Sequence, residues 1–249
     1  MQKIIIIGSA FPLRGGGITT FNERLAYEFQ HLGFEVVIYS FSLQYPSFLF
    51  PGKTQFESSP KPEDIAIKSV INSINPISWI KTANQIVKEK PELIIVRYWL
   101  PFMAPCLGSI LRLIKKKYDK KIIAITDNVI PHEKRPGDKQ LTSYFIKYCD
   151  GFISMSKAVL EELKVFTASP YKLFLPHPLY DTFGNKVDKI TALKFLNLNE
   201  KEKHVLFFGF VHQSQRGLEQ SIASVVLNPN QAQLQQFQCL KVLFVDLDE

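Results

Sequence analysis

Lys3–Gly8, with the sequence KIIIIG, is the stretch that decides the fold. It is a β-branched run that ends at a glycine, without alternation of polar and apolar residues. Such a run is typical of a strand covered on both faces, as in a parallel sheet between layers of helices. Apolar residues then recur at helical spacing, at Phe21, Leu25, Phe29 and Leu32. Because Gly33 supplies a stop signal after them, the chain is predicted to open with a strand and a helix that packs on it.

Residues 1–175 repeat this alternation of short β-branched runs and helical patterns. Parallel strands joined by right-handed crossovers produce such an alternation. The predicted strands are Lys3–Gly8, Glu35–Ser40, Leu93–Tyr98, Lys121–Thr126, Gly151–Ser154 and Lys172–Leu175. We therefore predict an α/β fold, with a Rossmann-like parallel sheet in a first domain that spans residues 1–185.

A second, smaller unit is predicted for residues 186–249. Its predicted elements are the helix Asp188–Leu198, the strand His204–Phe208, the helix Gly217–Val225 and the strand Leu240–Val245. A sheet of two or three strands cannot cover its own apolar faces. We therefore expect residues 186–249 to be a linker followed by an incomplete second α/β unit.

The composition excludes several classes of protein. A chain of 249 residues with 46% apolar and 21% charged residues is neither disordered, collagen-like nor a coiled coil as a whole. The longest nearly uncharged apolar stretch, Tyr98–Leu111, is interrupted by two prolines and is too short to span a bilayer. The chain begins with a predicted strand rather than a signal peptide, so we expect a cytoplasmic protein. Its three cysteines are far apart, which indicates neither a disulfide framework nor a zinc cluster.

The charge is unevenly distributed. The whole net charge of +7 lies in residues 1–185. An anionic ligand, a membrane surface or a nucleic acid fits this excess, and so do ordinary solvated lysines. Because the chain lacks a nucleic-acid recognition motif, we expect no nucleic-acid partner.

Gly15, Gly16 and Gly17 form a loop at the start of the first predicted helix, directly after Arg14. Glycines here let backbone N–H groups approach an anion or a sugar, and the helix dipole favours negative charge at this end. A tight turn is the alternative role. The spacing is not G-x-G-x-x-G, and Ser40–Ser42 stands where a dinucleotide fold has an acidic residue, so NAD is disfavoured.

Thr126–Asp138 is a polar loop at the end of the fourth predicted strand. Ligands of open α/β sheets collect at the carboxyl ends of strands. Asp127, the first carboxylate after the strand, is the candidate catalytic residue: it could contact a sugar hydroxyl or act as a base. Asn128, His132 and Glu133 are candidate substrate-binding residues together with the glycine loop. The alternative for His132 and Glu133 is a hydrogen bond to the loop backbone.

Two aromatic loops, Phe41–Pro51 and Arg97–Met103, follow the second and third predicted strands. Exposed aromatic side chains at this sheet edge could hold an acceptor or touch the inner face of a membrane. Packing of the loops on each other is equally compatible with the sequence.

Phe207–Leu218 repeats the order of strand, glycine turn and helix start in the second unit. Gly209, Arg216 and Gly217 are its candidate donor-phosphate residues, because a diphosphate can rest on backbone N–H groups with a guanidinium beside it. A helix cap with a surface arginine is the alternative.

Together these motifs resemble the retaining, nucleotide-sugar-dependent glycosyltransferases of the GT-B fold, specifically those like glycosyltransferase family 4. The motifs that carry the resemblance are Gly15–Gly17 with Phe21, Asp127–Glu133, Asp150–Ser156 and Phe207–Leu218. The resemblance implies two Rossmann-like domains, of which the first binds the acceptor and the second binds the nucleotide-sugar.

The resemblance also implies roles for single residues. Gly16 and Gly17 would lie near the donor sugar or phosphate, and Asp127 occupies the place where the family often has a histidine near the sugar. In the donor loop, His212 stands at the family's arginine and Arg216 replaces its lysine. The family's pair of donor-site glutamates has no counterpart before residue 249, so the resemblance implies a truncated second domain.

The function expected from the sequence is hexosyl transfer from a nucleotide-sugar to a glycan or a lipid-linked acceptor, in cell-envelope polysaccharide synthesis. No metal is expected, nor any cofactor besides the nucleotide-sugar, which is a substrate. Catalysis would come from positioning, and from N–H groups and cations that stabilise the departing diphosphate. The alternative is a non-catalytic acceptor-binding module that needs a partner with the donor half.

Overall fold

The computed structural model describes residues 2–14, 16–47, 54–57, 60–131, 133, 135–179, 184–201, 203–208 and 240–245, the last two ranges as backbone. The chain divides into two compact units, Met1–Pro178 and Leu179–Glu249. Each unit is described by itself.

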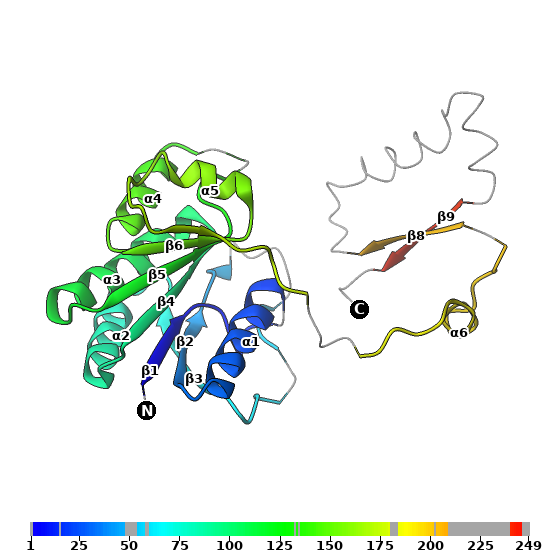
Figure 1. The fold of residues 1–249 in the computed structure, drawn as a ribbon, viewed down its shortest axis with the longest axis horizontal. Helices are drawn as coiled ribbons and strands as arrows, with labels where there is room; N and C mark the ends of the chain where they lie inside the picture. Colours follow the sequence, from blue (N-terminus) through cyan, green and yellow to red (C-terminus); the bar gives the residue numbers. More distant parts are fainter. Residues whose placement is uncertain are drawn as a thin grey trace. The chain divides into compact units, whose positions relative to one another are not determined.

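The first unit is built on a sheet of seven parallel strands in the order β3-β2-β1-β4-β5-β6-β7 (Figure 1). Its strands are β1 (Lys3–Ile7), β2 (Glu35–Leu43), β3 (Ala66–Asn72), β4 (Leu93–Tyr98), β5 (Lys121–Thr126), β6 (Gly151–Ser154) and β7 (Lys172–Phe174). The predicted fold class, an α/β Rossmann-like parallel sheet, is confirmed.

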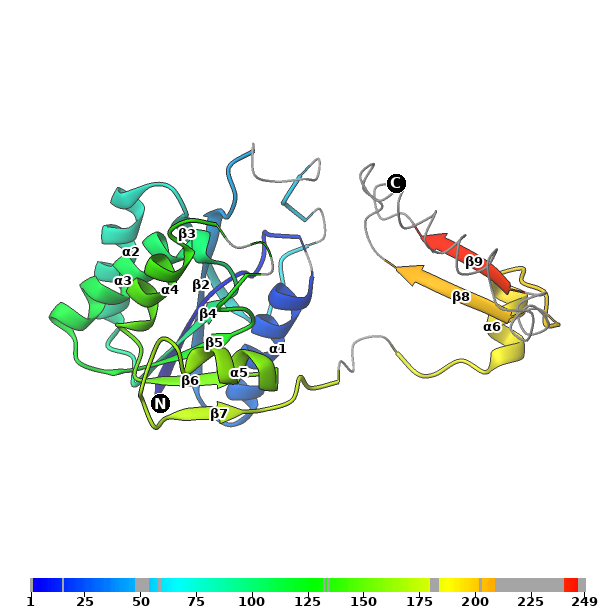
Figure 2. The same ribbon diagram turned by 90° about the horizontal axis from the view of Figure 1, so that it is seen from above.

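The α-helices in the described part of this unit cover the sheet unequally. They are α1 (Gly17–His31), α2 (Pro76–Glu89), α3 (Ala104–Lys117), α4 (Asp138–Ile146) and α5 (Lys157–Leu163); a short 3-10 helix, Pro101–Met103, precedes α3. Figure 2 shows α2, α3 and α4 on one side of the sheet and α1 on the other. The core residues of α5 lie with those of α2, α3 and α4. Right-handed crossovers require this arrangement, because β1 to β2 runs in one direction along the sheet and β3 to β7 runs in the other.

The first strand carries both cores. Ile5 and Ile7 belong to the core under α2–α5, while Ile4 and Ile6 belong to the core under α1. All four are at most 2% exposed. The KIIII run is therefore buried on both faces, which is why it lacks polar alternation.

Strand β3 was not predicted from the sequence. It pairs in parallel with β2 and lies at the end of the strand order. Most of its residues are exposed or half-buried, and Lys68 and Ser69 interrupt its apolar residues. An edge strand covers less apolar surface than a central one, so its sequence does not form a continuous β-branched run.

The described part of the second unit consists of one helix and two strands. The helix α6 (Lys189–Phe195) begins where Asp188 accepts a hydrogen bond from the Thr191 N–H at 3.0 Å. Strands β8 (Lys203–Phe208) and β9 (Leu240–Val245) pair in parallel. The predicted helix Gly217–Val225 lies outside the described residues. Among the helices that are described, none has the length and apolarity needed to cross a bilayer.

Glu89, at the end of α2, joins three elements. Its carboxylate accepts hydrogen bonds from Lys68 on β3 at 2.5 Å, from Lys3 on β1 at 3.3 Å, and from the hydroxyl of Tyr39 on β2. Burial alone raises the pKa of Glu89, but the hydrogen bonds from Lys68, Tyr39 and Lys3 outweigh it and hold the pKa below its ordinary value. The ionised form therefore ties α2 to the first three strands.

The lowered pKa of Glu89 predicts a loss of stability in acid. A carboxyl whose folded-state pKa is lowered stabilises the fold above its unfolded pKa of about 4.5, and this contribution is lost as the pH falls through the folded-state value. We expect Glu89→Gln to lower the free energy of unfolding at pH 7 by about 1–3 kcal/mol, and the difference from the wild type to shrink in acid. Urea unfolding between pH 3 and pH 7 measures both effects.

Glu92→Gln is the matched control. Glu92 pairs with Lys120 at 2.7 Å, but the Glu92 side chain is 52% exposed and this is a surface pair, so the change should cost less than about 1 kcal/mol. If Glu92→Gln shows the same pH dependence as Glu89→Gln, the assignment to Glu89 is wrong.

Candidate functional site

The candidate site lies where the direction of the strand order reverses. The chain passes from β1 to β2 on one side and from β4 to β5 on the other, so β1 and β4 flank the switch point. In open α/β sheets, ligands bind outside the carboxyl ends of the strands at this point. The start of α1 and the ends of β1, β4 and β5 are therefore the place where the side chains matter.

Arg97 and Asp127 form a two-pronged ion pair there. Nε of Arg97 donates to Oδ2 of Asp127, and Nη2 donates to Oδ1, both at 2.5 Å. Arg97 is the penultimate residue of β4 and is 2% exposed, whereas the Asp127 side chain is 22% exposed. The Asp127 N–H also donates to the carbonyl of Tyr98 at 2.9 Å, which ties the loop after β5 to the end of β4. Asp127 is thus fixed by both its backbone and its side chain.

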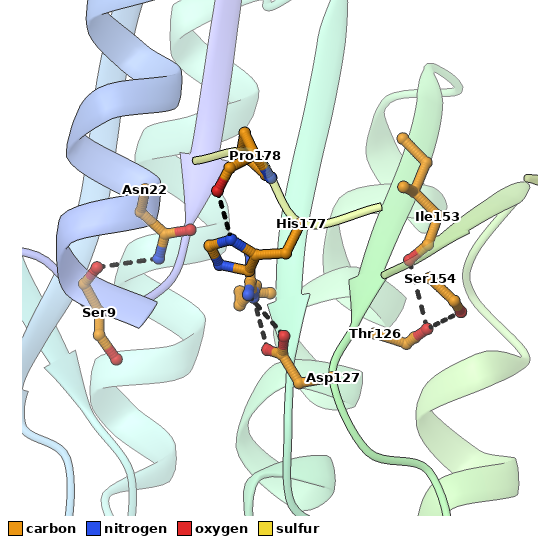
Figure 3. A network of polar contacts seen from close by, with 9 residues as sticks. Ser9, Asn22, Thr126, Asp127, Ile153, Ser154, His177 and Pro178 are labelled. Atoms are coloured by element: carbon orange, nitrogen blue, oxygen red, sulfur yellow. Dashed lines mark hydrogen bonds and ion pairs between the residues drawn. The ribbon is translucent and has the colours of Figure 1, made fainter. Parts of the chain in front are cut away.

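An aromatic ring lies over the Arg97 guanidinium. Its Cζ lies 4.3 Å from the centre of the Phe21 ring on α1, a cation–π contact. His177 packs edge-on against Phe21 with ring centres 5.5 Å apart. Figure 3 shows His177 between Asn22 of α1 and Asp127 at the end of β5. Nη1 of Arg97 is buried and has no hydrogen-bond partner within the described part of the chain.

The end of β1 holds α1 close to this pair. Nδ2 of Asn22 donates to the carbonyl of Ser9 at 2.9 Å, and Asn22 is 1% exposed. A Cβ atom on Gly8 would lie 2.6 Å from Nδ2 of Asn22 and 3.1 Å from Cβ of Arg97. Gly8 is therefore required for the close approach of β1, α1 and β4. Glu23 adds a second tie, because its Oε1 accepts from the Phe11 N–H at 2.8 Å.

Hydroxyl groups fix the other side of the site. Oγ1 of Thr126 and Oγ of Ser154 lie 2.7 Å apart at the ends of β5 and β6, and Thr126 also donates to the Ile153 carbonyl at 3.3 Å (Figure 3). Both hydroxyl residues are fully buried. They set the position of the residue that follows Thr126, which is Asp127.

The structure places some of the predicted site residues. Gly16 and Gly17 lie at the start of α1, and a Cβ atom on either would meet nothing within 4 Å, so the space in front of this 15-residue helix is open. Arg14 is exposed, and its N–H donates to the Gln55 carbonyl at 2.8 Å. Gly16, the residue before the first turn of α1, has an extended backbone.

Other predicted residues are less closely tied to the site. Asn128 is half-buried beside Asp127. Glu133 is 90% exposed and lies 3.9 Å from Arg135, as in an ordinary surface pair. The remaining candidates lie outside the described residues, so their roles stay predictions: Gly15, His132, Gly209, Arg216 and Gly217.

The aromatic loops pack on each other in their described parts. Nε1 of Trp99 donates to the Tyr45 hydroxyl at 2.6 Å, Phe41 meets Trp99 edge-on, and Tyr45 stacks on Phe102. Phe41 is fully buried and Trp99 is 9% exposed. Of the two alternatives left open by the sequence, packing between the loops holds for these four residues.

The cavities lined by described residues include one near the candidate site and one away from it. A shallow pocket of about 100 Å³ lies beside the start of α1; its lining residues are Leu13, Arg14, Thr19, Gln44, Tyr45 and Gln55. A larger one, about 270 Å³, lies at the β3 edge of the sheet and contains none of the predicted site residues. The described residues contain no group of three or more His, Cys, Asp or Glu side chains that could hold a metal ion.

Sequence reasoning missed Arg97, Asn22 and His177 as site residues. Arg97 stood within an aromatic loop and His177 between two prolines, which marked only a turn. A charged residue inside an otherwise apolar strand was the available signal for Arg97, because a buried guanidinium requires a partner. The sequence contains no comparable signal for His177.

No family model and no curated protein sequence matches this chain. Solved structures do match it. The chain is similar to an alpha,alpha-trehalose 6-phosphate synthase from Burkholderia multivorans at 10% identity and a TM-score of 0.57, over 99% of this chain and 64% of that one. It is similar to a trehalose-6-phosphate protein from E. coli bound with UDP-2-fluoro glucose at 10% identity and a TM-score of 0.56, over 98% and 64%.

A UDP-N-acetylglucosamine 2-epimerase from Rickettsia bellii is also similar, at 11% identity and a TM-score of 0.52, over 100% of this chain and 70% of that one. At these identities the likeness shows the fold, which is the Rossmann-like α/β architecture of GT-B proteins. The chain spans about 64% of the length of the two trehalose-6-phosphate structures.

The close approach at Gly8 predicts a specific sensitivity. Gly8→Ala should lower the free energy of unfolding by about 1–3 kcal/mol, because the new methyl group overlaps Asn22 and Arg97 in a closely packed place. Gly17→Ala, where the space is open and the backbone helical, should leave stability unchanged or raise it by up to about 1 kcal/mol. Chemical denaturation of both variants measures this difference, and equal effects would contradict the packing at Gly8.

Proposed function

We propose that this chain belongs to a retaining glycosyltransferase that moves a hexose from a nucleotide-sugar to a glycan or a lipid-linked acceptor. The observation that carries the proposal is the site at the switch point, where the carboxylate of Asp127 pairs with Arg97 beneath Phe21 of the helix α1, which starts at a glycine. The fold shared with nucleotide-sugar proteins supports it. The acceptor we propose is a cell-envelope saccharide, met in the cytoplasm at the inner face of the membrane.

The start of α1 supplies the electrostatic part of the proposal. The first N–H groups of a helix lack partners within the helix, and the helix dipole adds partial positive charge at this end. Because Gly16 and Gly17 carry no side chains, an anionic group of the donor can approach these N–H groups directly. Such groups stabilise negative charge that develops on a departing diphosphate.

In this proposal, the Asp127 carboxylate orients the sugar. Both carboxylate oxygens accept from Arg97, and a carboxylate has further lone pairs that can accept from a sugar hydroxyl. The pocket beside α1, with the amides of Gln44 and Gln55 and the Tyr45 hydroxyl, offers polar groups to the acceptor. Holding donor and acceptor in a reactive geometry is the largest contribution that these residues can make. Arg216, with Gly209 and Gly217, is proposed as the donor-phosphate element of the second unit.

The thermal unfolding midpoint, titrated with UDP, GDP and their hexose conjugates, tests the proposal. A ligand that binds the folded state raises the midpoint, and at one hundred times its dissociation constant it adds about 2.7 kcal/mol of stability. We expect one nucleotide to give a saturable rise. Gly16→Val should abolish the rise at a cost to the free protein of at most about 1 kcal/mol, because its side chain enters open space but valine is a poor N-cap residue.

In Arg216→Ala, at least a tenfold higher ligand concentration should be needed to produce the same rise in the unfolding midpoint. Lys117→Ala is its control, since Lys117 is a cation on α3 that bonds to Asn84. Transfer to an acceptor is then measured with the nucleotide-sugar that binds. A cooperatively unfolding chain that responds to none of the nucleotides would contradict the transferase proposal and favour the acceptor-binding module.

A further inference from the structure

Arg97 carries more hydrogen-bonding capacity than Asp127 uses. A guanidinium has five N–H groups in a planar fork. Asp127 accepts one from Nε and one from Nη2, which leaves one on Nη2 and both on Nη1. Nη1 is buried without a partner among the described residues. Leaving a buried charged donor unsatisfied is costly, so a ligand that accepts from Nη1 recovers this cost on binding.

The charges of Arg97 and Asp127 already balance each other. Arg97 contributes one positive charge and Asp127 one negative charge, at 2.5 Å in a two-pronged geometry. An anion that approached Arg97 would meet the Asp127 carboxylate at the same time. The pair therefore disfavours an anionic ligand group and suits an uncharged one.

The remaining groups match the chemistry of hydroxyls. Nη1 offers donors, and the partly exposed Asp127 carboxylate offers acceptors beside them. A sugar hydroxyl both donates and accepts, so one hydroxyl, or two neighbouring hydroxyls, can satisfy both residues at once. The Phe21 ring lies over the guanidinium and lowers the local dielectric, which strengthens such bonds.

We propose that Arg97 is a specificity-determining residue: by neutralising Asp127 and presenting Nη1, it makes the switch-point site selective for uncharged, hydroxyl-bearing sugar groups over anionic ones. This inference rests on the proposed function, because the sugar is the ligand that the proposal names. It assigns Asp127 to recognition of hydroxyls, and Arg97 to the choice between neutral and charged ligands.

The experiment compares two probes, methyl α-D-glucopyranoside and glucose 1-phosphate, bound to the whole chain and followed by ligand-observed NMR. The wild type should bind the neutral glycoside at this site, with little dependence on salt. Asp127→Asn keeps the size of the side chain but leaves the Arg97 charge unbalanced. We expect this variant to bind the neutral glycoside more weakly and the sugar phosphate more tightly than the wild type does. The ratio of the two affinities should change at least tenfold and become salt-dependent.

A second variant covers the risk that Asp127→Asn fails to fold. Replacing both partners of a buried ion pair by apolar residues is often neutral for stability, so Arg97→Met with Asp127→Leu should fold and bind neither probe at this site. Arg97→Lys keeps the charge but removes the planar fork, and should lose affinity for the neutral glycoside. Thermal unfolding of each variant shows whether it is folded.

The outcomes separate the inference from the proposed function. A wild type that does not bind the neutral glycoside, or an affinity ratio unchanged in Asp127→Asn, would overturn the inference. Retained glycoside binding by the folded double variant would also overturn it, because the pair would then be structural alone. If the ratio changes as expected while no nucleotide-sugar binds or reacts, the inference stands and glycosyl transfer is the part that fails.

Discussion

A guanidinium buried at the end of a central strand needs a partner, and Asp127 supplies it from the next strand. The pair occupies the position where β4 meets β5 in register, with Tyr98 beside Thr126. Without Asp127, Arg97 would be an uncompensated charge under α1, a situation that costs several kcal/mol where a pair is deeply buried. The loop after β5, the packing of Phe21 and the position of His177 all adapt to this one interaction.

Because Gly8 has no side chain, helix α1 can pack against the Arg97–Asp127 ion pair. Because β1 ends in a glycine, Asn22 of α1 reaches the Ser9 carbonyl and the helix settles against Arg97. The same approach places Phe21 of α1 over the Arg97 guanidinium. Packing at β1 thus sets the geometry of two different polar features, the glycine start of helix α1 and the neutral ion pair.

These two features differ in the ligand groups that they favour. The helix start favours negative charge, whereas the Arg97–Asp127 pair is neutral and favours hydroxyls. A nucleotide-sugar contains both kinds of group, a charged diphosphate and an uncharged sugar. The proposed function is the one that uses both features together, while a free anion would use the first alone and a neutral polyol the second alone.

The sequence by itself determined the central strands. The sequence predicted the observed bounds of two of them, Leu93–Tyr98 and Lys121–Thr126. A run rich in β-branched residues indicates a strand buried on both faces whatever the arrangement of the other elements. Asp127 was also accessible to sequence reasoning, as the first carboxylate after a strand. Tertiary structure alone decided that Arg97 pairs with Asp127, that His177 returns to the same place, and that the polar strand β3 joins the sheet edge. The reason is physical: these relations depend on strand register and crossover direction, which bring together residues far apart in the chain, and local patterns carry no record of them.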